Sequence, residues 1–111
     1  MIEMTLAHGS LERQAFVHLP PVYDGRTPLP LVLAFHGGGG QGKPYARFTG
    51  FDTLADKEGF IVVFPQGVDK QWYDARFTED LGQEEGPDDV GFTLALLEAL
   101  KQTYAIDEKR V

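Results

Sequence analysis

The sequence contains no cysteine and no asparagine, and its single serine is Ser10. The absence of cysteine excludes disulfide bonds, a thiolate nucleophile and cysteine metal ligands. No apolar run reaches membrane-spanning length, and no charged-then-apolar signal segment opens the chain. We therefore expect no membrane association, while the compartment stays open. Few thermolabile residues and seven prolines form a composition typical of thermophilic proteins.

Basic charge is also scarce. Ten Lys and Arg residues face 17 Asp and Glu residues, a net charge of −7 that argues against binding to nucleic acid or to an anionic membrane. Between Glu79 and Asp89 there are six acids and no base. We interpret this stretch as a solvated loop that ends by capping a helix; the alternative, a calcium site, needs an ordered oxygen cage that the spacing does not indicate. With 111 residues, 42% of them hydrophobic, the chain fits one globular domain.

The most informative stretch runs from Pro30 to Lys43. It contains the apolar run Leu31–Phe35, then His36, then the four glycines 37–40. Five apolar residues without a polar break predict a strand buried on both faces, as in a parallel sheet. Glycines directly after a strand allow a sharp turn with the N–H groups pointing outward. The pattern predicts an anion-binding loop at the carboxyl end of a strand.

Two chemistries use such a loop. Gly37 to Lys43 has the spacing of a phosphate-binding P-loop, but Pro44 stands where that motif needs Ser or Thr, so nucleotide binding is the distant alternative. The second chemistry is acyl transfer, in which a His-Gly-Gly-Gly loop donates backbone N–H groups to the oxyanion of the tetrahedral intermediate. A turn that binds nothing is a further interpretation, although ordering four glycines carries a high entropic cost.

The rest of the chain is interpreted from its periodicity. Apolar and polar residues alternate over Ile2–Ala7 and Gln14–Leu19, which predicts an antiparallel hairpin within residues 1–19 with one wet face. Residues 29–64 predict a βαβ unit that carries the glycine loop, with an irregular Lys43–Gly50, a helix over Phe51–Glu58 and a second buried strand over Phe60–Phe64.

The second half is expected to be a loop over residues 65–87, a helix over residues 88–104 and the start of another strand over residues 106–111. Asp88 suits the helix start, where a carboxylate favours the positive end of the dipole. We expect this helix to be packed on two sides, because it is apolar around its circumference. The expected stripe along it is Val90, Leu94, Leu97 and Leu100, widened by Phe92, Ala95, Leu96 and Ala99.

From Phe16 to Val111 the sequence resembles the polyhydroxybutyrate depolymerase and feruloyl esterase-like group of α/β-hydrolases. The small departures are Tyr73 and Ala75, where smaller or polar residues are usual. The motifs that carry the resemblance are Pro30–Leu33 before His36–Gly40, Val62–Gly67, Trp72 with Arg76, Asp88–Phe92, and Ile106-Asp107 with Lys109–Val111.

The resemblance implies an α/β fold, with this chain as the N-terminal half of an α/β-hydrolase and the nucleophile strand still to come. It implies that none of the catalytic triad lies here, because Gly-x-Ser-x-Gly, the acid and the histidine would all follow Val111. Ser10 falls in a predicted hairpin turn, and His8 and His18 fall at opposite ends of that hairpin, which disfavours a shared metal site. No metal and no organic cofactor are expected.

The site residues follow from the same resemblance. Gly37, Gly38 and Gly39 are expected to form the oxyanion hole, with His36 bracing the loop rather than acting as a base. Trp72 and Gln41 are candidates for the substrate pocket, although plain loop packing is an equally good interpretation for Trp72.

The expected function is the N-terminal portion of a serine carboxylester hydrolase that acts on polyester, feruloyl, acetyl or short-chain esters and is inactive alone. The alternative is a non-catalytic fragment or assembly module. By the strand order of the family, the missing strand would pair with Leu31–Phe35. We therefore expect an unpaired apolar edge there, and self-association or pairing with the missing segment.

Overall fold

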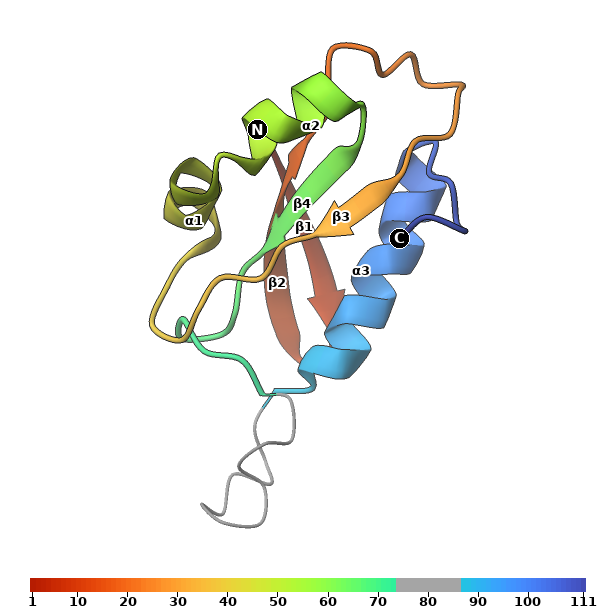
Figure 1. Ribbon diagram of the computed structural model, residues 1–111. Coiled ribbons are helices and arrows are strands. Elements are labelled where there is room, and N and C mark those ends of the chain that lie inside the picture. The colour runs from red at the N-terminus through yellow and green to blue at the C-terminus, as the bar shows by residue number, and fades with distance from the viewer. Residues whose placement is uncertain (74–86) are drawn as a thin grey trace.

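The computed structural model describes residues 1–73 and 87–111. Within these residues the chain forms four strands and three helices, arranged around one sheet (Figure 1). In chain order they are β1 (Ile2–His8), β2 (Leu11–His18), β3 (Leu31–Leu33), α1 (Gly42–Thr49), α2 (Phe51–Glu58), β4 (Ile61–Pro65) and α3 (Asp89–Thr103). None of these helices has the length and apolar content needed to cross a membrane.

The strand order in the sheet is β1-β2-β4-β3. Strands β1 and β2 pair antiparallel, and Gly9 takes a φ of 63° in the turn between them. Strand β2 pairs antiparallel with β4, whereas β3 runs parallel to β4. The expected hairpin and the expected parallel strand pair are therefore both present.

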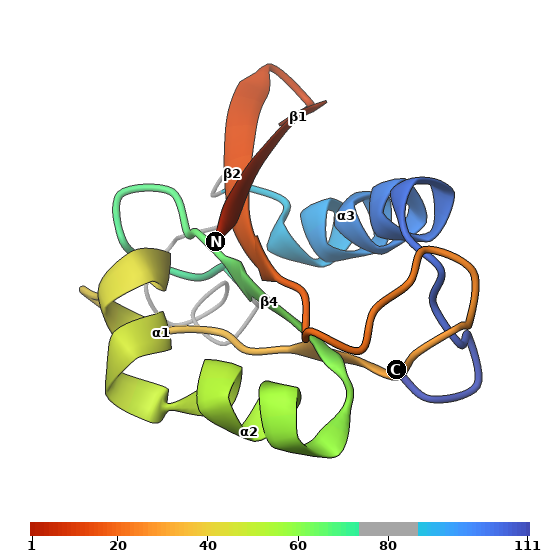
Figure 2. The same ribbon diagram turned by 90° about the horizontal axis from the view of Figure 1, so that it is seen from above.

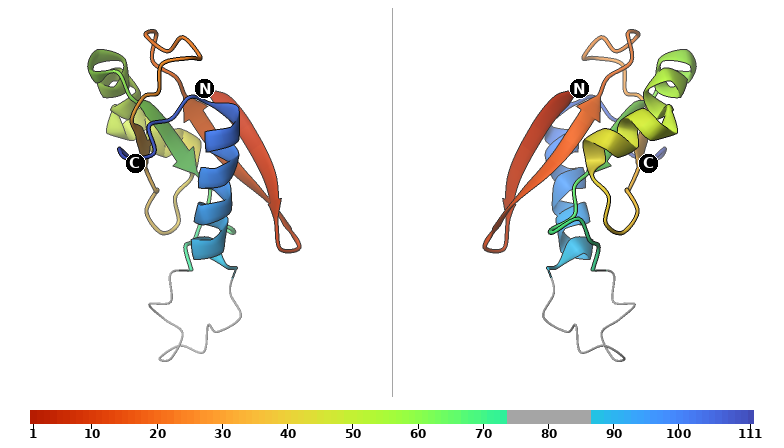
Figure 3. Two further views of the ribbon diagram at one scale, coloured as in Figure 1. Left: turned by 90° about the vertical axis from the view of Figure 1, so that its right-hand side faces the viewer. Right: turned by 90° about the vertical axis from the view of Figure 1, so that its left-hand side faces the viewer.

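Helices cover both faces of the sheet: α3 lies on one side, and α1 and α2 lie on the other (Figures 2 and 3). Strand β4 is buried along its whole length because its side chains alternate between the two layers. One core cluster joins Ile61 and Val63 to Phe92, Leu96 and Leu100 of α3, and the other joins Val62 and Phe64 to Ala46 of α1 and Ala55 of α2.

Strand β2 differs from the prediction of one wet face. Ala15, Phe16 and Val17 are all buried. Ala15 and Val17 belong to the core under α3, and Phe16 belongs to the core under α1 and α2. The second helical layer therefore covers the face that alternation alone assigned to solvent.

The segment expected to be irregular, Lys43–Gly50, forms most of α1. Pro44 is compatible with the helix because it lies in the first turn, where its missing N–H has no intrahelical partner. Gly50 ends α1 and Gly59 ends α2, both in the left-handed conformation, with φ of 66° and 79°. Helix α2 spans the predicted residues.

The expectation that Leu31–Phe35 is buried on both faces is wrong. The strand ends at Leu33, and Val32 and Phe35 are 37% and 39% exposed. Strand β3 is the outermost strand of the sheet, whereas α1 and α2 pack on β4. An outermost strand in this position leaves apolar side chains uncovered on one face.

Helix α3 begins after its N-cap Asp88, as predicted. The prediction that this helix is packed on two sides is wrong. Phe92, Leu96 and Leu100 are fully buried, whereas Val90 and Leu94 are each 61% exposed. Of the residues expected to be packed, Leu100, Phe92 and Leu96 are buried and Val90 and Leu94 are not, because the sheet covers only one side of the helix.

The C-terminal residues run beside the beginning of β3. Ile106 forms a single parallel bridge with Leu29, and the Asp107 N–H donates to the Leu29 carbonyl at 2.8 Å. The Leu31 N–H then donates to the Arg110 carbonyl at 3.0 Å. Residues 106–111 thus lie where the next strand was expected, with one bridge in place of a strand ladder.

Candidate functional site

The glycine loop is a tight turn directly beyond β3. The Gly40 N–H donates to the Gly37 carbonyl at 2.9 Å, and Gly39 has a φ of 79° at the third position, the pattern of a type II turn. The Gly39 N–H donates to the Lys70 carbonyl at 2.7 Å. Gly39 therefore has no amide to offer an oxyanion in this conformation, and the expected set of three donors is reduced by one.

Gly37 and Gly38 differ from the two glycines that follow them. Both are exposed, and within residues 1–73 and 87–111 neither N–H has a hydrogen-bond acceptor. A Cβ atom on Gly38 would lie 3.1 Å from the Gln71 side-chain oxygen, whereas one on Gly37 would meet nothing within 4 Å. The loop thus presents two adjacent amide donors at the carboxyl end of a strand.

His36 is the buried centre of this loop, with only 2% of its surface exposed. The Gly67 N–H donates to its Nε2 at 3.0 Å, which makes Nε2 an acceptor and places the ring proton on Nδ1. Nδ1–H then donates to the Gly37 carbonyl at 2.8 Å. Both ring nitrogens are engaged with the backbone, so a base role would require breaking one of these bonds.

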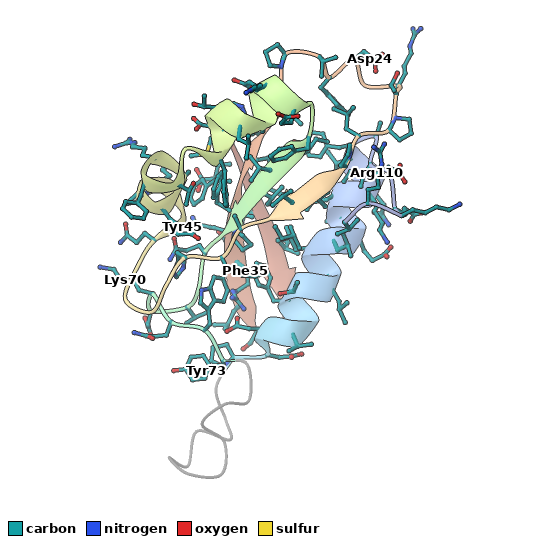
Figure 4. The ribbon with its side chains drawn as sticks, viewed as in Figure 1. Asp24, Phe35, Tyr45, Lys70, Tyr73 and Arg110 are labelled. Atoms are coloured by element: carbon teal, nitrogen blue, oxygen red, sulfur yellow. The ribbon has the colours of Figure 1, made fainter. Side chains whose placement is uncertain are left out.

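Trp72 packs against the same histidine. Its indole N–H donates to the His36 carbonyl at 2.7 Å, and the two rings lie 4.8 Å apart between centroids. The Phe35 ring meets the indole edge-on, with 5.1 Å between the ring centroids. Figure 4 labels Phe35, which follows the end of β3. In this structure Trp72 fixes the turn at the end of β3.

Gln41 lines a different feature, an open hollow of about 320 Å³. Trp72 is not part of its wall, so the two residues expected in one pocket lie in separate places. Asp69 and Lys70 of the hollow form a tight turn with positive φ values of 50° and 64°. The hollow is lined by Gln14, Phe16, Gln41, Lys43, Gln66, Gly67, Asp69 and Lys70.

Three of the amides that a P-loop would offer to phosphate are occupied. Besides the bonds at Gly39 and Gly40, the Gly42 N–H donates to the Gln66 side-chain oxygen at 2.7 Å. Gln66 thus occupies the amino end of α1, where a phosphate would bind. This arrangement counts against the nucleotide alternative.

A buried ion pair that sequence reasoning missed lies behind the loop. Arg13 Nη2 lies 2.6 Å from Asp89 Oδ1, and the two residues are 2% and 5% exposed. The Tyr73 N–H donates to the other oxygen of Asp89. The sequence does show Arg13 within the strand that continues into Ala15–Val17. Its partner could not be identified from the sequence, because Asp89 lies 76 positions away.

The remaining histidines pair with single carboxylates. His8 Nε2 lies 3.3 Å from Asp88, and His18 Nε2 lies 2.7 Å from Asp56. In the described part of the chain, no group of three or more potential metal ligands gathers. Hydrogen bonds from the Gly91 N–H and from His8 lower the pKa of the Asp88 carboxyl below its ordinary 3.8.

Several expectations fall on residues 74–86, which lie outside the described residues. They concern Ala75, Arg76 and most of the acidic stretch between Glu79 and Asp89. Ser10 is exposed in the turn between β1 and β2.

Comparison with solved structures gives the fold. A thermostable esterase superposes with a TM-score of 0.74 at 18% identity, over 96% of this chain and 32% of that protein. The FphF serine hydrolase of Staphylococcus aureus, which binds fluorophosphonates, superposes with a TM-score of 0.73 at 17% identity, over 98% of this chain and 43% of that protein. The predicted α/β-hydrolase fold class is confirmed.

Two curated relatives carry more sequence identity. An acetylxylan esterase of Coprinopsis cinerea is 35% identical over 100 residues, 86% of this chain and 26% of the relative. A bifunctional acetylxylan esterase/xylanase of Neocallimastix patriciarum is 34% identical over 82 residues, 74% of this chain and 11% of the relative. The chain therefore spans about a quarter or less of the length of these two relatives.

A family model covers nearly the whole chain. Residues 10–109 match the Esterase family, described as "Putative esterase". The match agrees with the resemblance to α/β-hydrolase esterases, although it does not separate the polyhydroxybutyrate depolymerase and feruloyl esterase groups. The chain belongs to this esterase family.

Proposed function

We propose that this chain supplies the oxyanion-binding portion of a serine carboxylester hydrolase, with the N–H groups of Gly37 and Gly38 as donors. The observation that supports it is the contrast within one turn: within the described ranges these two amides have no acceptor, while those of Gly39 and Gly40 do. Preorganised donors at the point where negative charge develops typically contribute more to acyl-transfer catalysis than any other single effect.

The neighbours of the two donors support the same role. His36 is bonded through both ring nitrogens and its carbonyl, and the indole of Trp72 packs on its ring. A loop fixed in this way does not have to reorganise when an oxyanion forms, which is the condition under which amide donors are most effective.

The substrate class proposed for the whole enzyme is an acetyl ester carried on a polysaccharide. The support is that both curated relatives are named acetylxylan esterases. Polyester and feruloyl esters, which follow from the sequence resemblance, are the competing classes. A comparison of hydrolysis of acetylated xylan, methyl ferulate and short polyhydroxybutyrate oligomers by the complete enzyme separates the three.

We propose that the chain alone has no esterase activity. Ser10, its only serine, lies exposed in a hairpin turn, and His36 has both ring nitrogens engaged. The test is turnover of 4-nitrophenyl acetate by the chain and by Ser10→Ala. Turnover that survives in Ser10→Ala would reveal an unassigned nucleophile, and turnover lost in Ser10→Ala would make Ser10 the nucleophile; either result overturns the proposal.

The donor role can be tested in a fusion with the downstream part of the Coprinopsis acetylxylan esterase. Gly37→Pro removes one N–H, whereas Gly37→Ala keeps it and meets nothing within 4 Å. We expect kcat to fall about 10²–10³-fold for the proline variant and by less than about threefold for the alanine variant. Equal losses in the two variants would refute the donor role. Unchanged Trp72 emission in the same variants of the unfused chain checks that the turn is intact.

A second candidate function is a non-catalytic assembly module. The observation in its favour is the open edge of β3, where Val32 and Phe35 are exposed. Along β3 the backbone N–H and C=O groups point alternately toward β4 and away from it. Those of Leu33 point away from β4, and no described residue forms a hydrogen bond with them. A fusion that folds but hydrolyses none of the three ester classes would favour this candidate over the esterase.

A further inference from the structure

We infer that the buried pair Arg13–Asp89 is a positioning element for the glycine loop. The inference rests on the proposed oxyanion function. The pair joins β2 to the first turn of α3, and it reaches the two segments that hold His36, residues 66–67 and residues 72–73. No other ion pair among the described residues is buried on both sides.

The first arm runs through Asp89. One of its oxygens accepts from Arg13, and the other accepts the N–H of Tyr73. The neighbouring Trp72 donates its indole N–H to the His36 carbonyl and stacks on the imidazole. The carboxylate therefore fixes the backbone position from which the indole reaches the loop.

The second arm runs through Arg13. Its Nη2 also lies 3.4 Å from the Gln66 carbonyl. The Gln66 side chain accepts the Gly42 N–H, and the next residue, Gly67, donates its N–H to His36 Nε2 at 3.0 Å. The two arms meet at His36, one at its ring nitrogen and the other at its carbonyl, and the free amides of the turn follow directly after that residue.

The cost of burying charge explains why this pair points to positioning rather than to stability. Removing two charges from water is expensive, and replacement of a buried ion pair by apolar residues of similar volume is often neutral or stabilising. The Arg13 guanidinium carbon also lies over the Phe92 ring, 3.8 Å from its centroid, a contact that an apolar side chain can keep. A pair retained for position should therefore be replaceable without loss of the fold but with loss of order at the loop.

The test compares three variants of the full 111-residue chain. Arg13→Met with Asp89→Leu removes both charges, Asp89→Asn removes one, and Asp88→Asn is the matched control at the same helix end. Asp88 contacts Gly91 and His8 but neither arm. Trp72 is the only tryptophan, so its emission reports on one arm, and amide hydrogen exchange at Gly67 reports on the other.

In the double variant we expect the urea midpoint to be retained, while hydrogen exchange at Gly67 and at the Trp72 indole quickens about five- to tenfold, the loss of about one hydrogen bond at each site. Asp88→Asn should lower the midpoint and leave these two rates unchanged relative to the rest of the chain. Native exchange and native emission in a folded double variant would overturn the inference.

If the double variant does not fold, the Asp89→Asn variant tests the inference instead, because asparagine keeps one side-chain oxygen at this position while it removes the negative charge. Faster hydrogen exchange at the Gly67 amide and the Trp72 indole, in a variant whose urea midpoint equals that of Asp88→Asn, supports the positioning role. A uniform increase in exchange over the whole chain overturns it. None of these readouts requires catalysis. Failure of the esterase proposal in the fusion would therefore leave them intact, and failure of the positioning inference would leave the Gly37→Pro comparison intact.

Discussion

At the scale of single residues, His36 contributes more to the stability of the glycine loop than any of the glycines does. Its replacement by alanine leaves the Gly67 N–H without a partner, leaves the Gly37 carbonyl with the Gly40 N–H as its one donor, and opens a cavity under Trp72. We expect the free energy of unfolding to fall by about 2–4 kcal/mol. Urea unfolding followed by far-UV circular dichroism measures it. His18→Ala, which removes a half-exposed contact with Asp56, should cost less than about 1 kcal/mol, and equal losses would refute the bracing role.

Asp88 gives a residue-scale prediction about pH. The Gly91 N–H and His8 lower the pKa of its carboxyl in the folded chain below 3.8, so the unfolded chain binds more protons in this range. The stabilisation is present above the ordinary pKa of 3.8 and is lost as the pH falls through the lower, folded value. Thermal midpoints between pH 5 and pH 2.5, roughly the range in which carboxylates titrate, should therefore fall less steeply for Asp88→Asn. Parallel curves would contradict the shift.

At the scale of elements, the one-sided burial of α3 separates leucines that the sequence periodicity had placed in one packed surface. Leu96 is fully buried against the sheet, and Leu94, two positions earlier, is 61% exposed. Leu96→Ala should lower the free energy of unfolding by about 2–5 kcal/mol, through lost transfer energy and a cavity. Leu94→Ala should change it by less than about 1 kcal/mol. Urea midpoints of the two variants test the one-sided burial, and equal losses would indicate the two-sided packing expected from the sequence.

Local signals account for the elements that could be predicted. Gly59 marks the end of α2 and Asp88 the beginning of α3, because a left-handed end and a carboxylate cap are properties of single positions. Helix α1 was missed because Gly42 and Pro44 are usually breakers. Here the proline falls in the first turn and the glycine allows a close approach, since a Cβ at Gly42 would lie 2.9 Å from the Phe16 ring.

The candidate site was predictable only in part, for the same reason. The glycine turn and its histidine are consecutive in the chain, so their pattern is visible as a motif. The partner of Arg13 lies 76 positions away, and the carbonyl that occupies the Gly39 amide belongs to Lys70. Contacts between distant segments depend on how the sheet brings its ends together, and no local pattern encodes them.

At the scale of the whole molecule, the described sheet has two edge strands, of which β3 carries the exposed apolar side chains beside the glycine loop. Strand β1 forms one edge, and β3 forms the other with its first residues bonded to residues 105–110. Beyond them, the outward groups of Leu33 have no partner in the described part of the chain, and Val32 and Phe35 are exposed nearby. An apolar edge strand of this kind is a template for another strand.

The open edge predicts association of the isolated chain. In sedimentation velocity at rising concentration we expect dimers or larger species, and Val32→Lys should shift the population toward monomer because a lysine opposes edge pairing. Phe48→Lys is the matched control, since it also replaces an exposed apolar residue, 87% exposed, but on α1. A chain that stays monomeric, or a Phe48→Lys variant that dissociates as much as Val32→Lys, would show that the β3 edge does not drive assembly. In the fusion, a downstream strand has to pair with the β3 edge to bring its residues next to the glycine turn. The same Val32→Lys variant should therefore also lower the activity of the fusion.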